Sequence, residues 1–182
     1  MKITSVSTVV YRQSLKPGGP QPKFAGEGRS TFESLLVKVE TDAGIVGWGE
    51  AFPHRVWRAV RALVETLIAP VCIGADPTDI SGLMGRLMRH TYGVGRAGPV
   101  MFALSGLDTA LWDILGKAAN LPVYLLLGGP VREFVPTKFS ISGVEPARAA
   151  EIAAWAVEQG FRTMKVKVGI EPEGDVARVR VT

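Results

Sequence analysis

Residues 161–169 read FRTMKVKVG, a stretch with the composition of a β-strand that ends in glycine. Side chains alternate between the two faces of a strand, so Lys165 and Lys167 are predicted to share one face and the apolar residues beside them the other. Two neighbouring ammonium groups repel each other, which favours the loss of a proton from one of them. A lysine in that state can serve as a general base. The alternative is an ordinary half-exposed strand with two solvated lysines.

The segments around this strand predict parallel βα units. Residues 135–141 have the composition of a strand, residues 145–159 predict a helix that ends at Gly160, and residues 172–181 begin a further helix. An alternation of strands and helices is typical of a parallel β/α fold. Two such units are too few to close a barrel.

The preceding residues predict a different architecture, in which strands come first and helices follow. The turn Asp42-Ala43-Gly44 makes the second and third strands an antiparallel hairpin. Gly47 and Gly49 indicate a bulge or the close approach of another backbone, and Trp48 between them is predicted to be a core residue. From Val56 onward the apolar residues recur with a helical period. The strands are predicted at 3–12, 32–41 and 45–51, and the helices at 56–69 (ending before Pro70), 77–91 (with Asp76 as N-cap) and 99–119.

The composition is that of an ordinary globular protein. Hydrophobic residues make up 47% and charged residues 21% of the 182 residues, and the net charge is +4, with no basic run that would suit nucleic acid. The single cysteine, Cys72, allows no internal disulfide, which fits a reducing compartment. The first residues lack the apolar segment of a signal peptide, and no apolar run is long enough to cross a bilayer. We therefore expect a cytoplasmic protein with no nucleic-acid or membrane partner.

Four segments, taken in order along the chain, resemble one known family. They are VETDAGIVGWGEA at 39–51, ALSGLDTALWDILGK at 103–117, LPVYLLLGG at 121–129, and Lys165-Val166-Lys167 followed by Val168-Gly169. Together they resemble the enolase superfamily, in the group of mandelate racemase and muconate lactonizing enzyme. The resemblance implies an α+β capping domain at residues 1–128, with a three-stranded antiparallel sheet and a helical layer. It implies the first βα units of a modified TIM-type β/α barrel at residues 129–182.

The resemblance also implies a chemistry. Members of this group are Mg²⁺-dependent racemases, epimerases, cycloisomerases or dehydratases that remove the α-proton of a carboxylate substrate to give an enediolate. On this basis Lys167 would be the base, and Lys165 would lie against the substrate carboxylate and assist it. Both would sit near the C-terminal end of the second barrel strand, where the active sites of such barrels are built. The partners implied are a small carboxylate substrate and further copies of the complete protein, as a homo-oligomer.

By the same resemblance, substrate-binding residues are expected in three places. These are the long loop at 14–30 that closes over the site in this family, the loop after the third strand, and the end of the first barrel strand. The residues are Lys23, Phe24, Arg29, His54, Arg55 and Ser140. For the loop residues the alternative is a solvated loop, and for His54 it is a residue at a helix N-terminus with no ligand.

No metal ligand is predicted in this sequence. In the family, the acidic ligands come from the third, fourth and fifth barrel strands, and the sequence is expected to end before them. Glu173 and Asp175 are predicted to lie on a helix and do not match ligand positions. We therefore expect the N-terminal half of a family member, with the barrel truncated and Mg²⁺ bound only in the complete protein. The alternative function is a non-catalytic capping-domain fragment with at most an interaction role.

Overall fold

The computed structural model describes residues 1–14, 23–24, 27–28 and 31–182, which form two compact units. The first unit comprises Met1–Gln13 and Glu33–Val131. The second comprises Arg132–Thr182 with the described residues of Ser14–Phe32. The second unit thus begins close to the predicted domain boundary at 128/129, which itself stays a prediction.

The first unit is built on a three-stranded antiparallel sheet. Its strands are β1 (Ile3–Ser14), β4 (Thr31–Thr41) and β5 (Val46–Ala51), in the order β1-β4-β5. β4 and β5 form the predicted hairpin, in which Lys38 pairs with Trp48 and Val39 with Gly47. Gly44 closes the turn with a φ of 74°, a left-handed conformation that glycine adopts without strain. The hairpin and the three-stranded sheet are therefore confirmed.

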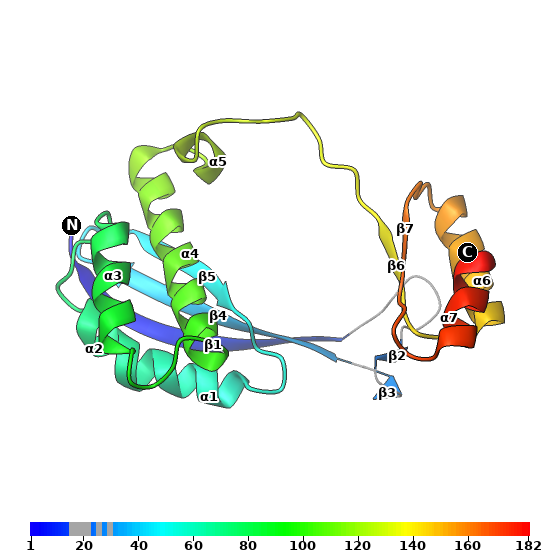
Figure 1. Ribbon diagram of the computed structural model, residues 1–182. Helices are drawn as coiled ribbons and strands as arrows, with labels where there is room; N and C mark the ends of the chain where they lie inside the picture. The colour runs from blue at the N-terminus through cyan, green and yellow to red at the C-terminus, as the bar shows by residue number, and fades with distance from the viewer. Residues whose placement is uncertain (15–22, 25–26, 29–30) are drawn as a thin grey trace. The chain divides into compact units, whose positions relative to one another are not determined.

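Helices cover one face of this sheet (Figure 1). The layer contains α1 (Trp57–Ala62), the π-helical segment η1 (Leu63–Ile68), α2 (Ala69–Cys72), α3 (Ile80–His90) and α4 (Pro99–Ala119), and α5 (Val123–Leu126) follows α4. No helix in the described ranges is both long and apolar enough to span a bilayer.

Two details of the helical layer differ from the prediction. The first helix does not end before Pro70 but continues through it as α2. Proline has no N–H to donate, and the wider π-helical turn of η1 places Pro70 at a position where no N–H is needed. Asp76 is not a helix N-cap, since its Oδ1 accepts hydrogen bonds from the N–H and hydroxyl of Thr78 in a preceding turn. The N-cap of α3 is Asp79, whose side chain accepts from the N–H of Gly82.

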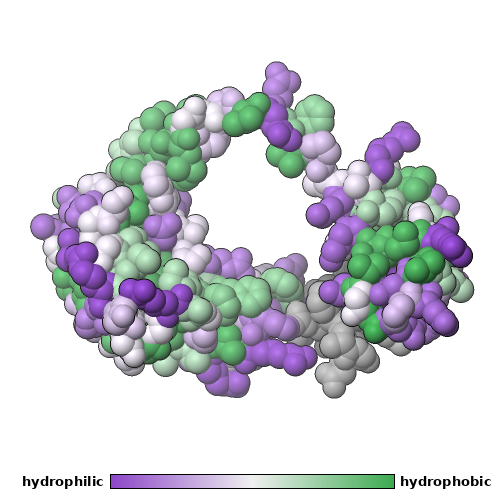
Figure 2. Space-filling view, viewed as in Figure 1, coloured by the Kyte–Doolittle hydropathy of each residue, from purple (hydrophilic) through white to green (hydrophobic). Residues whose placement is uncertain are grey.

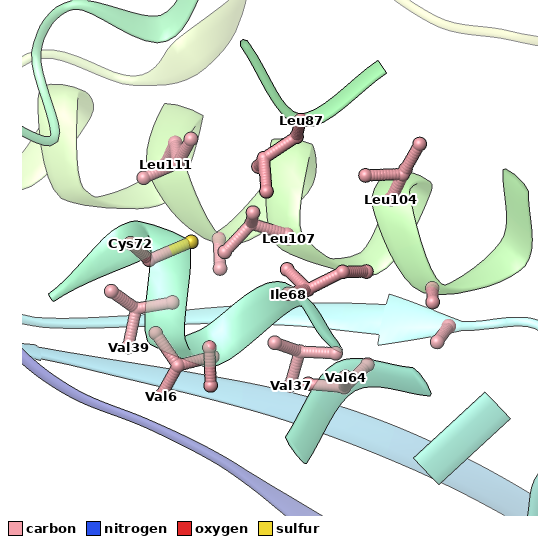
Figure 3. Close-up of a cluster of buried hydrophobic side chains, with 14 of the residues drawn as sticks. Val6, Val37, Val39, Val64, Ile68, Cys72, Leu87, Leu104, Leu107 and Leu111 are labelled. Atoms are coloured by element: carbon pink, nitrogen blue, oxygen red, sulfur yellow. The ribbon is translucent and has the colours of Figure 1, made fainter. Parts of the chain in front are cut away.

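The core of the first unit lies between α4, the η1 segment and the sheet. Figure 3 shows Leu104, Leu107 and Leu111 of α4 above Val37 and Val39 of β4. All of these side chains are buried. The regular apolar stripe predicted along residues 99–119 is therefore the stripe that faces the sheet.

Glycines allow α4 to lie very close to β5. A Cβ at Gly49 would overlap the carbonyl oxygen of Gly106, and a Cβ at Gly106 would lie 2.8 Å from a Val37 methyl group. The predicted close backbone approach at Gly47 and Gly49 is confirmed. Because both glycines face the helix, Trp48 points to the opposite face and is 39% exposed, so its prediction as a core residue is wrong.

Polar side chains of α4 close the free edge of the sheet. The carboxylate of Asp113 accepts a hydrogen bond from the N–H of Trp48 (2.8 Å), and the ammonium of Lys117 donates to the carbonyl of Val46 (2.7 Å). Asp113 and Lys117 also form an ion pair at 2.6 Å. An edge strand whose backbone groups are satisfied in this way is protected from pairing with another chain.

The second unit contains a short parallel sheet with helices on one side. β6 (Phe139–Ile141) and β7 (Met164–Val166) are parallel, and α6 (Pro146–Glu158) and α7 (Pro172–Arg180) follow them in turn. α6 packs against the apolar face of the sheet through a small core around Ile141 and Ile152. The unit also contains a two-residue pair of strands, β2 (Lys23–Phe24) and β3 (Glu27–Gly28).

The predicted βα order of this unit is confirmed, but both strands are shorter than predicted. β6 and β7 have three residues each, and within the part of the chain that the structure describes they pair with each other. Figure 2 shows apolar surface in patches between polar side chains on this unit. Side chains that are about half exposed include Val157, Val168, Ile170, Val176 and Val179. Two βα units therefore leave apolar surface that they do not cover themselves.

Candidate functional site

The candidate site lies at the C-terminal end of β6 and β7. Ser140 and Lys165 are partners in the parallel register, so their side chains leave the same face of the sheet next to each other. Lys167 follows β7 directly, and its N–H donates to the carbonyl of Ile141 at 3.0 Å, which extends the ladder by one residue. By alternation, Lys167 belongs to the same face as Lys165, roughly 6–7 Å further along. The opposite face carries Ile141, which is buried against α6.

The side chains of Lys165 and Lys167 are exposed to solvent. Within the ranges that the structure describes, neither ammonium group has a hydrogen bond or an ion pair, whereas Lys38 and Lys117 pair with Glu40 and Asp113. Two unpaired positive charges on one face attract an anionic ligand. A carboxylate is therefore a fitting ligand for this end of the sheet.

A buried ion pair on α7 holds the chain that follows Lys167. The guanidinium of Arg178, only 3% exposed, donates to the carbonyl oxygens of Val144 (2.6 Å) and Lys167 (3.1 Å) and to the carboxylate of Asp175 (2.7 Å). The other carboxylate oxygen of Asp175 accepts from the N–H of Gly169 (2.6 Å) and the N–H of Ile170 (3.2 Å). We call Asp175 and Arg178 the α7 clamp.

The clamp has a consequence for the charge of its acid. Burial alone would raise the pKa of Asp175, but hydrogen bonds from Gly169, Arg178 and Ile170 outweigh it and hold that pKa below its ordinary value. Asp175 is therefore ionised at neutral pH, and it balances the positive charge of Arg178.

The loops beside the lysines are fitted closely to each other. A Cβ at Gly143, in the connection from β6 to α6, would overlap the side chain of Ile170 and lie 3.8 Å from Cγ of Lys167. Glycine at this position therefore leaves room for the side chain of Ile170, while the stem of Lys167 would be in ordinary contact. Ser142, in the same connection, is half-buried.

His54 and Arg55 form a second group, in the first unit, between β5 and α1. The imidazole of His54 lies 6.0 Å from the ring of Phe52, which in turn makes an edge contact at 4.9 Å with Phe102 of α4. Arg55 has a φ of 60°, an uncommon conformation for a residue with a side chain. Both residues are exposed and precede the first turn of α1. This position is compatible with contact to a ligand, and equally with residues at a helix N-terminus that bind no ligand.

The residues predicted in the long loop are described only in part. Lys23 and Phe24 form β2, with Lys23 opposite Gly28 and Phe24 opposite Glu27. Arg29 lies outside the described residues. The structure therefore brings together Ser140, Lys165 and Lys167, while His54 and Arg55 belong to the other unit.

The described residues offer no fitting site for a divalent metal. Within those ranges, no group of three or more His, Cys, Asp or Glu side chains could hold an ion. Asp175, the acid nearest to the lysine strand in sequence, is engaged with Arg178 and two amides. A Mg²⁺ site needs oxygen ligands that these residues do not supply.

The α7 clamp is the feature that the sequence did not predict. Asp175 was expected only to lie on a helix away from metal ligands, and Arg178 was not singled out. An acid and an arginine three positions apart, directly after a strand and a glycine turn, are the available signal. An acid and an arginine at this spacing are too common in helices to predict such a pair from the sequence.

The comparisons with known proteins agree on one family. The model of the mandelate racemase / muconate lactonizing enzyme N-terminal domain matches residues 6–128. An N-succinyl-L-Arg/Lys racemase of Bacillus cereus is 33% identical over 98% of this chain and 47% of its own length, and its crystal structure superposes with a TM-score of 0.86. A D-galactonate dehydratase of Pectobacterium atrosepticum is 40% identical over 80% of this chain and 37% of its own length. The chain thus spans half or less of the curated relatives it matches.

Solved structures extend the likeness over the whole chain. A member of the enolase superfamily from Polaromonas sp. is 34% identical, with a TM-score of 0.85 over 100% of this chain and 48% of its own. A Bordetella bronchiseptica protein solved in complex with 2-oxoglutarate/phosphate is 32% identical, with a TM-score of 0.82, over 99% of this chain and 48% of its own. A Roseovarius nubinhibens protein solved in complex with magnesium is 29% identical, with a TM-score of 0.82, over 100% of this chain and 49% of its own.

Proposed function

This chain belongs to the mandelate racemase / muconate lactonizing enzyme family, and from that premise we propose that the complete protein removes the α-proton of a carboxylate substrate to form an enediolate. Its relatives include racemases and dehydratases, two reactions that can begin with this step. Lys167 is proposed as the base. Lys165 is proposed to lie against the substrate carboxylate and to assist Lys167.

The observation that carries this proposal is a pair of lysines at the end of β7 whose ammonium groups have no ionic or hydrogen-bond partner in the described ranges. An α-proton next to a carboxylate is very weakly acidic, so the base must be able to give up its own proton near neutral pH. A second positive charge on the same face attracts the carboxylate. Ser140, beside Lys165 in the register, can donate a hydrogen bond to the same carboxylate.

The remaining predicted residues are proposed to select the substrate. Lys23, Phe24 and Arg29 would contribute from the early loop, and His54 and Arg55 from the turn after β5. Since the mouth of a barrel is where its ligands bind, residues from a capping domain can decide which side group of a carboxylate fits. Further copies of the protein, as a homo-oligomer, remain part of the proposal for the complete protein.

Magnesium enters this proposal only at the level of the complete protein. A relative was solved with magnesium, and sites of the enolase superfamily use one or two Mg²⁺ ions to stabilise the enediolate. Because the described residues of this chain do not fit a metal, no step is assigned to an ion held by them. The steps assigned here belong to the two lysines and Ser140.

The test is solvent deuterium incorporation at the substrate α-carbon by the product of the complete reading frame. The panel should hold N-acyl amino acids and sugar acids, the classes named for its relatives. Lys167→Met keeps most of the side-chain volume and removes the base, so exchange on the face that Lys167 serves should fall by roughly a hundred-fold or more. Lys165→Met should weaken substrate binding as well as the rate.

Lys138→Met is the matched control, since Lys138 is an exposed lysine just before β6 and should leave exchange unchanged. Exchange at the wild-type rate in Lys167→Met would place the base elsewhere. Absence of exchange in the wild-type protein with every member of the panel would favour the non-catalytic role.

A further inference from the structure

The α7 clamp acts on the residue proposed to be the base. Lys167 has both of its backbone groups engaged, its N–H by Ile141 of β6 and its carbonyl by Arg178 of α7. The amides of Gly169 and Ile170, two and three residues further along, are engaged by Asp175. The backbone groups of Lys167, Gly169 and Ile170 are therefore held by two side chains of one helix and by the neighbouring strand.

The geometry of the turn explains why these contacts converge. Gly169 has a φ of 88°, so the chain reverses directly after the strand and presents two successive N–H groups to one carboxylate oxygen. Arg178 then ties this turn to the β6–α6 connection through the carbonyl of Val144. The ends of both strands are thus held at one point.

The short sheet gives this contact its importance. β7 has three residues and pairs with one strand, and such a small sheet holds its ends weakly by itself. A reacting side chain must be held within fractions of an ångström of its working position, and its supporting contacts decide whether it is.

We propose that Asp175 and Arg178 are positioning residues for Lys167, which fix the backbone from which its ammonium group reaches the substrate. The proposal rests on the proposed role of Lys167 as base, and it adds that neither Asp175 nor Arg178 touches the substrate. It also distinguishes the two lysines. Lys165 lies within the ladder, opposite Ser140, and depends less on the clamp than Lys167 does.

The test compares the two lysines in the same molecule. In the 182-residue chain, the rate of acylation of each lysine by acetic anhydride is measured against pH by mass spectrometry, together with amide exchange of Gly169 and Ile170 by NMR. The variant Arg178→Lys keeps the positive charge but cannot reach all three acceptors at once. Arg180→Met is the matched control, since Arg180 is an exposed arginine on the same helix.

In Arg178→Lys, exchange of the two amides is expected to accelerate roughly ten-fold, since local opening becomes easier. The dependence of the acylation rate on pH, the acylation profile, should change for Lys167 and stay the same for Lys165. Arg180→Met should change neither dependence. In the product of the complete reading frame, kcat for α-proton exchange should fall roughly ten- to hundred-fold with KM nearly unchanged.

The second variant is Asp175→Asn, which keeps the volume and one acceptor oxygen, and it should move the Lys167 profile in the same way. An unchanged Lys167 profile in both variants, or an equal change at Lys165, would overturn the positioning role. If the NMR spectrum of both variants showed an unfolded second unit, the positioning role would also be overturned. Asp175 and Arg178 would then stabilise the unit as a whole. The wild-type protein could exchange no substrate proton while the clamp variants still change the acylation rate of Lys167. In that case the proposed function fails and the positioning of Lys167 by the clamp stands.

Discussion

Replacing Gly49 by alanine tests how closely α4 is packed on β5. The added methyl group would overlap the carbonyl oxygen of Gly106 and lie 2.8 Å from the amide nitrogen of Ala110. Both atoms belong to the backbone of a buried helix and cannot rotate away. To restore normal contacts the helix would have to move outward by on the order of 1 Å, which forfeits up to about half of the dispersion energy across that contact. We expect Gly49→Ala to destabilise the first unit by about 3 kcal/mol, the upper end of the usual range for overpacking.

The assay is urea unfolding followed by tryptophan fluorescence. Trp155→Phe serves as the background, because Trp155 is the tryptophan of the second unit and the remaining three then report on the first. With a slope of about 1–3 kcal/mol per molar urea, a loss of about 3 kcal/mol lowers the midpoint by 1 M or more.

The control is Gly85→Ala, in the same layer but with open space. The nearest atom to a Cβ at Gly85 would be the end of the Arg89 side chain at 3.7 Å, so the added methyl group meets nothing rigid. Alanine also favours helix, and the variant is expected to be neutral or more stable by up to about 1 kcal/mol. A midpoint for Gly49→Ala that equals that of Gly85→Ala would refute the close packing of α4 on β5.

Two further outcomes follow from titratable groups. Cys72 is buried, and burial raises its pKa to about 12, so iodoacetamide at pH 8 should leave the native thiol unmodified and alkylate it fully in urea; rapid native alkylation would contradict this. Hydrogen bonds hold the pKa of Asp175 below its ordinary value, so the stability it provides is complete above about pH 4 and is lost as the pH falls through its native pKa. Trp155 fluorescence should therefore report acid unfolding of the second unit, and a pH profile unchanged in Asp175→Asn would contradict this assignment.

Much of the fold could be predicted because its signals are local and repeated. The stripe of α4 recurs over many turns, and the turn at Asp42-Ala43-Gly44 allows few alternatives. Where the prediction failed, a contact between distant segments decided the outcome. Pro70 continues a helix because a π-helical turn precedes it, and Trp48 is exposed because its two glycine neighbours pack on α4. The alternation of side chains along β5 would have placed Trp48 correctly, had the glycines been assigned to the buried face first.

The candidate site was predictable only where a strand periodicity applies. Alternation along the strand predicted that Lys165 and Lys167 share a face, whereas the register that places Ser140 beside Lys165 is known only from the structure. The contacts of Arg178 could not be predicted, because they join a helix to two loops and follow no period. The strands at 135–141 and 161–169 were predicted to be longer than β6 and β7 are, because a β-type composition favours a strand without fixing how far its pairing continues.

In the second unit, the contacts of the α7 clamp and the charges of the two lysines act on the same short strand end. Two ammonium groups without an ionic partner among the described residues lie at the end of a three-residue strand, and their mutual repulsion opposes the local fold. The sheet alone supplies few hydrogen bonds against it. Arg178 adds a further positive charge nearby, yet its charge is balanced by Asp175, and its donors go to backbone carbonyls at the strand ends. The same ion pair can therefore hold the backbone at the end of β7, while the carboxylate of Asp175 is engaged by Arg178 and two amides and not by either lysine.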